Sequence, residues 1–208
     1  MSKIRVDSRI GALVLAAGSS SRMGEPKQLL PLANSTVLGR TLENLFAAKV
    51  DEIVLVLGSS AETIQQWIAE SPIKHLKIVV NPEYEQGMAT SLRVGLAALN
   101  ENIDAALIVL ADQPFIRTDT FDRIADQYRQ SDAQIVIPMF QGSRGNPVLL
   151  DRSIFHEVIA LRGDIGFRVI FGKHLDGIIK TEVNDMGVLL DIDNKEDYER
   201  LRNLGQSG

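Results

Sequence analysis

Five short apolar runs along the chain are typical of strands that are covered on both faces of a parallel sheet. They occupy residues 10–17, 52–57, 76–80, 105–110 and 134–138. Between them, apolar residues recur at helical spacing, which predicts amphipathic helices at residues 36–48, 61–69, 89–99 and 118–129. Strands that alternate with helices in this way predict a doubly wound α/β fold with a mostly parallel sheet. Sheets of this kind bind ligands at the carboxyl ends of their strands.

The pattern changes after Pro138. Residues 139–150 are rich in turn formers and predict a turn flanked by extended segments. Two short helices should follow, then short strands at 177–182 and 187–190 and a last helix at about 195–204. We therefore expect one domain over residues 1–208, with a Rossmann-like sheet and a small C-terminal β/α extension.

Composition removes several classes of function. Twenty-two basic against 27 acidic residues give a net charge of −5, which argues against a broad nucleic-acid surface. The absence of cysteine excludes disulfides, thiolate metal sites and a cysteine nucleophile. The first nine residues are too polar for a signal peptide, and no apolar run approaches the length of a membrane span. These features predict a cytoplasmic protein without nucleic-acid or membrane partners.

A glycine-rich loop, Gly18-Ser-Ser-Ser-Arg-Met-Gly24, follows the first strand. Such loops let backbone N–H groups approach phosphate. The loop fails the Walker A pattern because Glu25 follows the second glycine, and it fails the dinucleotide fingerprint because Ser20 stands at the middle glycine position. Arg22 and Lys27 could bind phosphate oxygens, one as a planar fork and one as a point charge. A surface loop with incidental charges is the alternative.

Two acidic motifs lie farther along the chain. Asp112, in Leu110-Ala-Asp-Gln-Pro114, follows a buried strand and should lie at the ligand-binding edge, although a turn aspartate is the commoner role. The second motif is Leu190-Asp-Ile-Asp-Asn-Lys-Glu-Asp197, in which Asp193 or Asn194 could simply cap the last helix.

The segment Leu15-Ala-Ala-Gly-Ser-Ser-Ser-Arg-Met-Gly24 with Pro26-Lys27 resembles the loop of the MobA-like nucleotidyltransferases. Asn81-Pro-Glu-Tyr-Glu-Gln-Gly-Met-Ala-Thr-Ser91 is similar to a second motif of related enzymes. The resemblance implies that the following residues bind the nucleotide: Leu15, Ala16, Ala17, Gly18, Arg22, Lys27, Gly87 and Ser91. The last two would lie beside the base, although a helical serine is more often a small packing residue.

The same resemblance implies a divalent metal, Mg²⁺ or Mn²⁺. Asp112 corresponds to the metal-binding aspartate of a D-x-P motif, so the implied catalytic set is Arg22, Lys27 and Asp112. Asp193 matches the second metal ligand of a D-I-D motif, with Asp191 as its competitor. Mg²⁺ takes oxygen ligands, usually one or two carboxylates plus phosphates.

The acceptor side is implied by Gly145-Asn-Pro147 and Gly163-Asp-Ile-Gly-Phe-Arg168, which are similar to segments of the molybdopterin cytidylyltransferase branch. These place Asn146, Asp164 and Arg168 near the acceptor, with Asn146 in place of the usual histidine. Asp164 and Arg168 could alternatively form a local helix pair. The nucleotide-binding part would span about 8–137 and the acceptor-side part about 138–204.

The resemblance as a whole implies a fold of nucleotide-diphospho-sugar transferase type. It also implies transfer of CMP from CTP, or of a nucleotide from another NTP, to the phosphate of molybdenum cofactor (molybdopterin), with release of pyrophosphate. A molybdoenzyme or its insertion chaperone would be the natural partner. One alternative is transfer to a sugar or polyol phosphate. Another is a Rossmann-type dinucleotide-binding oxidoreductase or a non-catalytic nucleotide-binding protein.

Overall fold

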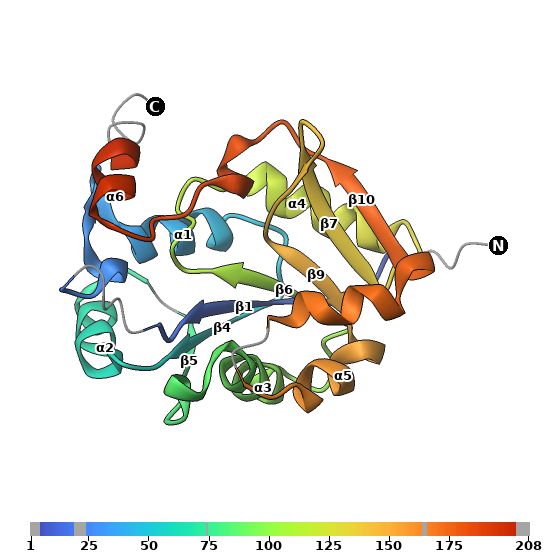
Figure 1. Cartoon of the computed structure of the whole chain (residues 1–208), viewed down its shortest axis with the longest axis horizontal. Coiled ribbons are helices and arrows are strands. Elements are labelled where there is room, and N and C mark those ends of the chain that lie inside the picture. Colours follow the sequence, from blue (N-terminus) through green and yellow to red (C-terminus); the bar gives the residue numbers. More distant parts are fainter. Residues whose placement is uncertain (1–4, 19–23, 74, 164–165, 203–208) are drawn as a thin grey trace.

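A computed structural model of the chain describes residues 5–18, 24–73, 75–163 and 166–202. One sheet runs through the molecule in the order β10-β7-β9-β6-β1-β4-β5, with β8 paired to β7 (Figure 1). The strands are β1 (Ile10–Ala16), β4 (Glu52–Leu57), β5 (Lys77–Val80), β6 (Ala105–Leu110), β7 (Ile135–Phe140), β8 (Ser143–Arg144), β9 (Val148–Asp151) and β10 (Ile178–Glu182). Among the strands of the described residues, four pairs are parallel, whereas β9 runs antiparallel to both β6 and β7, and β8 runs antiparallel to β7. The expected doubly wound, mostly parallel α/β fold is confirmed.

Helices cover both faces of this sheet. The α-helices are α1 (Val37–Phe46), α2 (Ala61–Glu70), α3 (Met88–Ala98), α4 (Thr118–Arg129), α5 (Phe155–Ala160) and α6 (Lys195–Arg202). Helices α1, α2 and α4 contribute to the core on one face, and α3 and α5 pack on the other with the 3₁₀ helix η4 (Phe167–Lys173). Among the described residues, no helix combines the length and apolar character needed to cross a bilayer.

Strand β1 shows why its sequence is apolar throughout. Ile10 and Val14 enter the core beneath α1 and α4, whereas Leu13 enters the core beneath α3, and all three are fully buried. Because the two faces of a strand alternate, a strand covered on both faces has no polar positions. Its carboxyl end lies between those of β4 and β6, where the chain has moved from one side of β1 to the other. This switch point is where open α/β sheets bind ligands.

The expected strand at residues 187–190 is wrong. The chain instead forms the 3₁₀ helix η6 (Met186–Leu189). The carboxylate of Asp185 accepts hydrogen bonds from the backbone N–H of Gly187 (2.9 Å) and the hydroxyl of Thr120 (2.6 Å). A side chain that caps the backbone in this way competes with a strand ladder, whatever the β propensity of the valine and leucines that follow.

A small satellite cluster packs outside the main sheet. It is built on the hairpin of β2 (Pro31–Leu32) and β3 (Ser35–Thr36), and its buried members include Ile192 and Leu201. The hydroxyl of Tyr198 on α6 donates to the carbonyl of Pro31 at 2.6 Å. In Figure 1 the red α6 accordingly lies beside the blue hairpin region. The C-terminal helix is thus attached to the segment that follows the glycine-rich loop.

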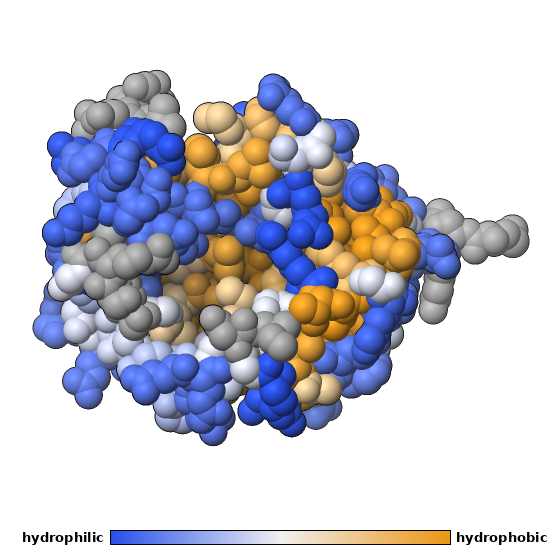
Figure 2. Space-filling model, viewed as in Figure 1, coloured by the Kyte–Doolittle hydropathy of each residue, from blue (hydrophilic) through white to orange (hydrophobic). Residues whose placement is uncertain are grey.

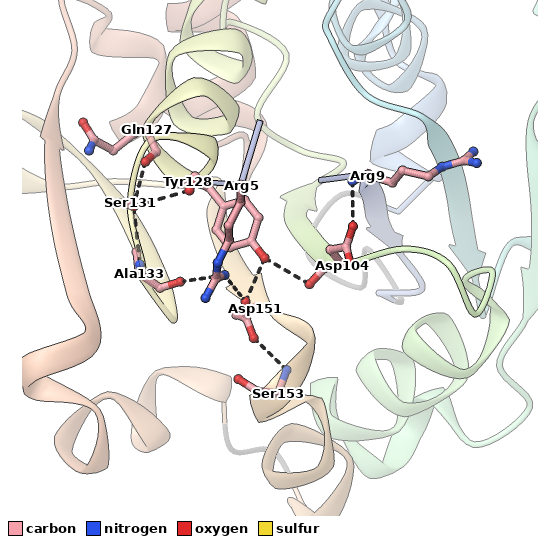
Figure 3. A network of polar contacts seen from close by, with 9 residues as sticks. All are labelled: Arg5, Arg9, Asp104, Gln127, Tyr128, Ser131, Ala133, Asp151 and Ser153. Atoms are coloured by element: carbon pink, nitrogen blue, oxygen red, sulfur yellow. Dashed lines mark hydrogen bonds and ion pairs between the residues drawn. The ribbon is translucent and has the colours of Figure 1, made fainter. Parts of the chain in front are cut away.

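A polar network attaches the N-terminal segment to α4 and to the end of β9. Figure 3 shows Arg5, Tyr128 and Asp151 pointing toward one another. The Asp151 carboxylate pairs with the Arg5 guanidinium and accepts hydrogen bonds from the Tyr128 hydroxyl (2.7 Å) and the Ser153 N–H (2.8 Å). Burial alone would raise the pKa of Asp151, but the hydrogen bonds from Ser153 and Tyr128 and the Arg5 charge hold that pKa below its usual value.

Replacing Asp151 by asparagine should lower the free energy of unfolding at pH 7 by about 2 kcal/mol, because Arg5 loses its buried partner. A carboxyl group whose pKa is lower in the folded state than in the unfolded state stabilises the fold at pH values above its unfolded pKa. This stabilisation is lost as the pH falls through the folded-state pKa. The difference between variant and wild type should therefore shrink below about pH 4. Urea titrations followed by circular dichroism check this. Asp132→Asn, at an exposed position, is the control, and a pH-independent difference would contradict the account.

Candidate active site

A cavity of about 630 Å³ opens at the carboxyl ends of the parallel strands. Figure 2 shows the face hollowed at its centre, with hydrophobic atoms at the floor of the hollow. The lining residues come from the ends of β1 and β6 and from the loop before α3: Leu15, Ala16, Ala17, Gly18, Lys27, Gln28, Tyr84, Glu85, Gln86, Gly87, Met88, Ser91, Leu110, Ala111 and Asp112. The cavity therefore brings together eight of the residues that the motifs predicted. An apolar pocket with a few convergent polar groups is typical of a small-molecule site.

The first wall of the cavity is the end of β1. Gln28 is almost fully buried, and its side-chain amide donates to the carbonyl of Ala16 at 3.2 Å. This bond fixes the backbone just before Gly18. Gly58, at the end of β4, presses on the same backbone: a Cβ there would lie 2.4 Å from the Ala17 carbonyl oxygen. The first wall is therefore held from both sides.

The second wall is the start of α3. The buried amide of Asn81 donates to the hydroxyls of Thr90 (2.8 Å) and Ser91 (3.0 Å), which fixes the loop against the helix. Gly87 stands at the helix N-cap with φ 103°, a conformation that side chains rarely adopt. Ser91 is buried, lines the cavity and accepts from Asn81. It thus packs, as a small helical serine commonly does, while also facing the cavity.

Lys27 joins two carboxylates at the rim. Its Nζ lies 2.6 Å from Asp112 Oδ2 and 3.3 Å from Asp193 Oδ1. The three side chains come from the loop after β1, the end of β6 and the segment before α6, which are far apart in the sequence. The ammonium is mostly buried, with 14% of the side chain exposed. The structure therefore assembles three of the four charged residues that the motifs singled out, while Arg22 lies outside the described residues.

The position of Asp193 follows from its neighbours. Ile192 is fully buried in the satellite cluster, and its N–H donates to the carbonyl of Asp112 at 3.0 Å. Asn194, not Asp193, caps the last helix, since its side chain accepts from the N–H of Asp197 at 2.9 Å. The carboxylate of Asp193 does not cap the helix and instead pairs with Lys27. Asp191 lies nearby, and partial burial beside the carboxylates of Asp193 and Asp112 raises its pKa.

These residues fit a divalent cation that also binds phosphate. Asp112 Oδ1 is buried and has no hydrogen-bond partner among the described residues, which is costly unless something else satisfies it. A cation, Lys27 Nζ, already lies between Asp112 and Asp193. No group of three carboxylate or histidine residues suited to a metal occurs in the described part of the chain. Two carboxylates are enough for Mg²⁺ when phosphate oxygens complete its coordination.

Two of the residues that were predicted for the acceptor side, Asn146 and Arg168, contact each other next to η6. Arg168 Nη2 donates to Asn146 Oδ1 at 2.8 Å, and the N–H of Asn146 donates to the carbonyl of Val188 at 3.0 Å. Asp164 lies outside the described residues. Arg168 therefore contacts Asn146, its partner in the predicted set.

Two contributors to the site, Gln28 and Asn81, were not predicted as site residues. Both are buried polar side chains that hold cavity backbone in place. Asn81 belongs to a recognised motif and Gln28 directly follows Lys27, so the sequence could have indicated that both residues lie near the site. The sequence could not indicate that these two side chains are buried, because a polar residue beside a loop is ordinarily exposed.

Replacing Gly58 by alanine should displace the backbone of the two cavity walls that pack against it. The added Cβ would lie 2.4 Å from the Ala17 carbonyl oxygen and 2.8 Å from Tyr84 Cβ, so backbone on both walls must shift. We expect the free energy of unfolding to fall by about 2 kcal/mol and nucleotide affinity to fall with it. Urea unfolding and calorimetric nucleotide titration measure the two effects. Gly172→Ala, which meets nothing within 4 Å, is the control; equal behaviour of the two variants would contradict the prediction.

Comparison with known proteins gives a consistent result. A family model described as the MobA-like NTP transferase domain matches residues 12–178. The molybdenum cofactor cytidylyltransferase of Escherichia coli (strain K12) is 26% identical over 193 residues, 92% of this chain and 94% of the relative. The nicotine blue oxidoreductase of Paenarthrobacter nicotinovorans is 28% identical over 199 residues, 92% of this chain and 96% of the relative.

Solved structures agree with this picture. Rv0371c from Mycobacterium tuberculosis H37Rv is 32% identical and superposes with a TM-score of 0.81, over 94% of this chain and 98% of that one. A complex of Rv0371c with manganese is 31% identical with the same TM-score, over 94% and 98% of the two chains.

Proposed function

Because the chain belongs to the MobA-like NTP transferase family, we propose that it transfers CMP from CTP to the phosphate of molybdenum cofactor and releases pyrophosphate. The observation that carries the proposal is the convergence of Lys27, Asp112 and Asp193 at the rim of the apolar cavity. An NTP bound with its base between the two walls would present its phosphates to these charges. The name of the Escherichia coli relative supports the choice of acceptor and nucleotide.

The chemistry requires charge compensation more than proton transfer. The acceptor phosphate is already ionised near neutral pH, so it needs no general base to attack the α-phosphorus of the NTP. The obstacle is repulsion between two anions, which Lys27 offsets by its charge. Asp112 and Asp193 would hold Mg²⁺ or Mn²⁺, which supplies Lewis-acid stabilisation of the phosphate oxygens when bound. The walls formed by residues 15–18 and 87–91 orient the nucleotide, so that the reactants meet in one geometry.

A matrix of nucleotides and acceptors tests the proposal. Each of the four NTPs is incubated with Mg²⁺ and with molybdenum cofactor, a sugar 1-phosphate or a polyol phosphate, and pyrophosphate release is measured. We expect release only with CTP and molybdenum cofactor. Release with a sugar or polyol phosphate would keep the reaction class and change the acceptor. The absence of release with every pair would reject nucleotidyl transfer.

A second candidate of another class rests on one observation. A relative that matches nearly the whole chain bears the name of an oxidoreductase. A reductase would bind a nicotinamide dinucleotide in the same cavity, although Ser20 stands where the dinucleotide fingerprint needs its middle glycine. Fluorescence titration with NADH and NADPH in EDTA separates the two. Tight, metal-independent binding would favour the oxidoreductase, and metal-dependent binding of CTP would favour the transferase.

A further inference from the structure

Two arginines in the part of the chain that follows β7, Arg144 and Arg168, have an unusual environment. Arg144 ends β8 and Arg168 lies on η4, and both are exposed. Neither forms an ion pair with a carboxylate of the described residues. Arg123, Arg152 and Arg162 also lack such a partner within that part of the chain, but each donates to backbone carbonyls. Arg144 and Arg168 do not, so their charges are available to a ligand.

Both side chains are nevertheless held in place. The Arg144 guanidinium carbon lies 5.4 Å from the ring centroid of Phe171, which is buried on the same η4 that carries Arg168. Arg168 donates to Asn146 Oδ1 at 2.8 Å. An arginine stacked on a ring, or bonded to an amide, has already lost part of its rotamer freedom, so binding an anion requires less ordering.

The two positive charges also influence each other. Although the Arg168 residue is exposed, its guanidinium is partly desolvated, and this desolvation and the neighbouring Arg144 charge both lower the pKa of Arg168. Like charges repel, and an anion bound by both guanidinium groups would remove the repulsion. A phosphate matches two guanidinium groups well, because each planar fork can donate two hydrogen bonds to its oxygens.

A short segment of chain links the arginines to the catalytic charges, and the arginines do not line the nucleotide cavity. The segment that carries Asp193 connects them: the Asn146 N–H bonds to Val188, and the Ile192 N–H bonds to Asp112. Four residues of chain span at most about 14 Å between these two bonds. None of Arg144, Asn146 and Arg168 is among the residues that line the cavity. An anion at the arginines would therefore belong to the second substrate rather than to the NTP.

We propose that Arg144 and Arg168 form an anion clamp that binds the phosphate group of a phosphomonoester acceptor. This inference rests on the proposed nucleotidyl transfer, for which it supplies the acceptor's binding site. It adds Arg144, which no motif in the sequence indicated. Asn146 acts as a positioning residue, because its carbonyl oxygen fixes the Arg168 guanidinium.

Inorganic phosphate is the probe, titrated by calorimetry in EDTA so that no metal contributes. Arg144→Gln and Arg168→Gln keep most of the aliphatic stem and remove the charge. Each should weaken phosphate binding about tenfold, and the double variant more. Arg162→Gln, at an exposed arginine with only local carbonyl contacts, should match wild type. Lys27→Met reports any phosphate bound at the nucleotide loop, and the arginine-dependent part should persist in it.

Titration of CTP with Mg²⁺ separates this inference from the proposed function. The glutamine variants should bind the nucleotide within about twofold of wild type, since an exposed charge that does not line the cavity contributes little to nucleotide affinity. Unchanged phosphate affinity in the double variant, or a parallel loss of nucleotide affinity, would overturn the clamp. Failure of wild type to bind any NTP would reject the transferase and leave the phosphate result standing. If circular dichroism shows that a glutamine variant is unfolded, the corresponding lysine variant is used, and a severalfold loss is expected because the fork is gone.

Discussion

Replacing Asp112 by asparagine should reduce kcat/KM for pyrophosphate release at least about a hundredfold, the usual scale for removing one preorganised electrostatic group. The amide preserves the shape of the side chain but removes the charge that pairs with Lys27 and would bind the metal. Its oxygen is a far weaker ligand for a divalent cation than a carboxylate is. Steady-state kinetics with CTP, Mg²⁺ and acceptor measure the effect.

The control is Asp119→Asn, which removes an exposed carboxylate whose ion pair with Arg117 lies on the surface of α4. That variant should keep wild-type kinetics. Asp112→Asn should remain folded, because the turn at Asp112 is held by backbone hydrogen bonds such as the one from Ile192. A folded Asp112→Asn protein with wild-type turnover would remove this carboxylate from the mechanism.

Replacing Lys27 by methionine should have two effects of opposite sign. Without nucleotide, the variant should bind Mn²⁺ about tenfold more tightly, because the ammonium no longer occupies the space between Asp112 and Asp193. With nucleotide, kcat/KM should fall about a hundredfold, because the cation that offsets phosphate repulsion is missing. Electron paramagnetic resonance of free Mn²⁺ measures the first effect, and pyrophosphate release measures the second.

Lys49→Met is the matched control, since Lys49 pairs with Asp126 on an exposed surface. It should change neither quantity. If Lys27→Met weakened Mn²⁺ binding, the lysine would help to build the metal site rather than compete with it. The opposed signs matter because general loss of folding lowers both quantities together, whereas removal of a competing cation does not.

The strands and helices of the nucleotide-binding part could be predicted because their signals are local. The run at residues 105–110 and the stripe at 118–129 coincide with β6 and α4. Residues 187–190 were mistaken for a strand because the bonds that decide their conformation come from Asp185, which caps the turn, and not from the apolar residues themselves. The spacing of apolar residues indicates which positions are buried, but it does not indicate where a side chain caps the backbone.

The candidate site could be predicted only through whole motifs. Taken alone, Asp112 is typical of a turn and Ser91 is typical of a packing residue. Only the order of the motifs along the chain favours a functional role for them. Arg144 was not predicted because its proposed role depends on its neighbours Phe171 and Arg168. Both lie on η4, which is separated from Arg144 in the sequence by β9 and α5. Contacts between segments distant in sequence leave no pattern in either segment.

The position of β9 also has a consequence for synthesis on the ribosome. This strand is inserted between β6 and β7, yet β7 precedes it in the chain. While β9 is still being made, the edge of β6 with which it will pair, residues 105–108, is unsatisfied, and this stretch is apolar throughout. An open, apolar strand edge invites pairing with other chains, and pairings between distant segments form slowly. The nascent chain should therefore depend on chaperones until residue 151 has emerged, and stalled chains that end before β9 should be prone to aggregation.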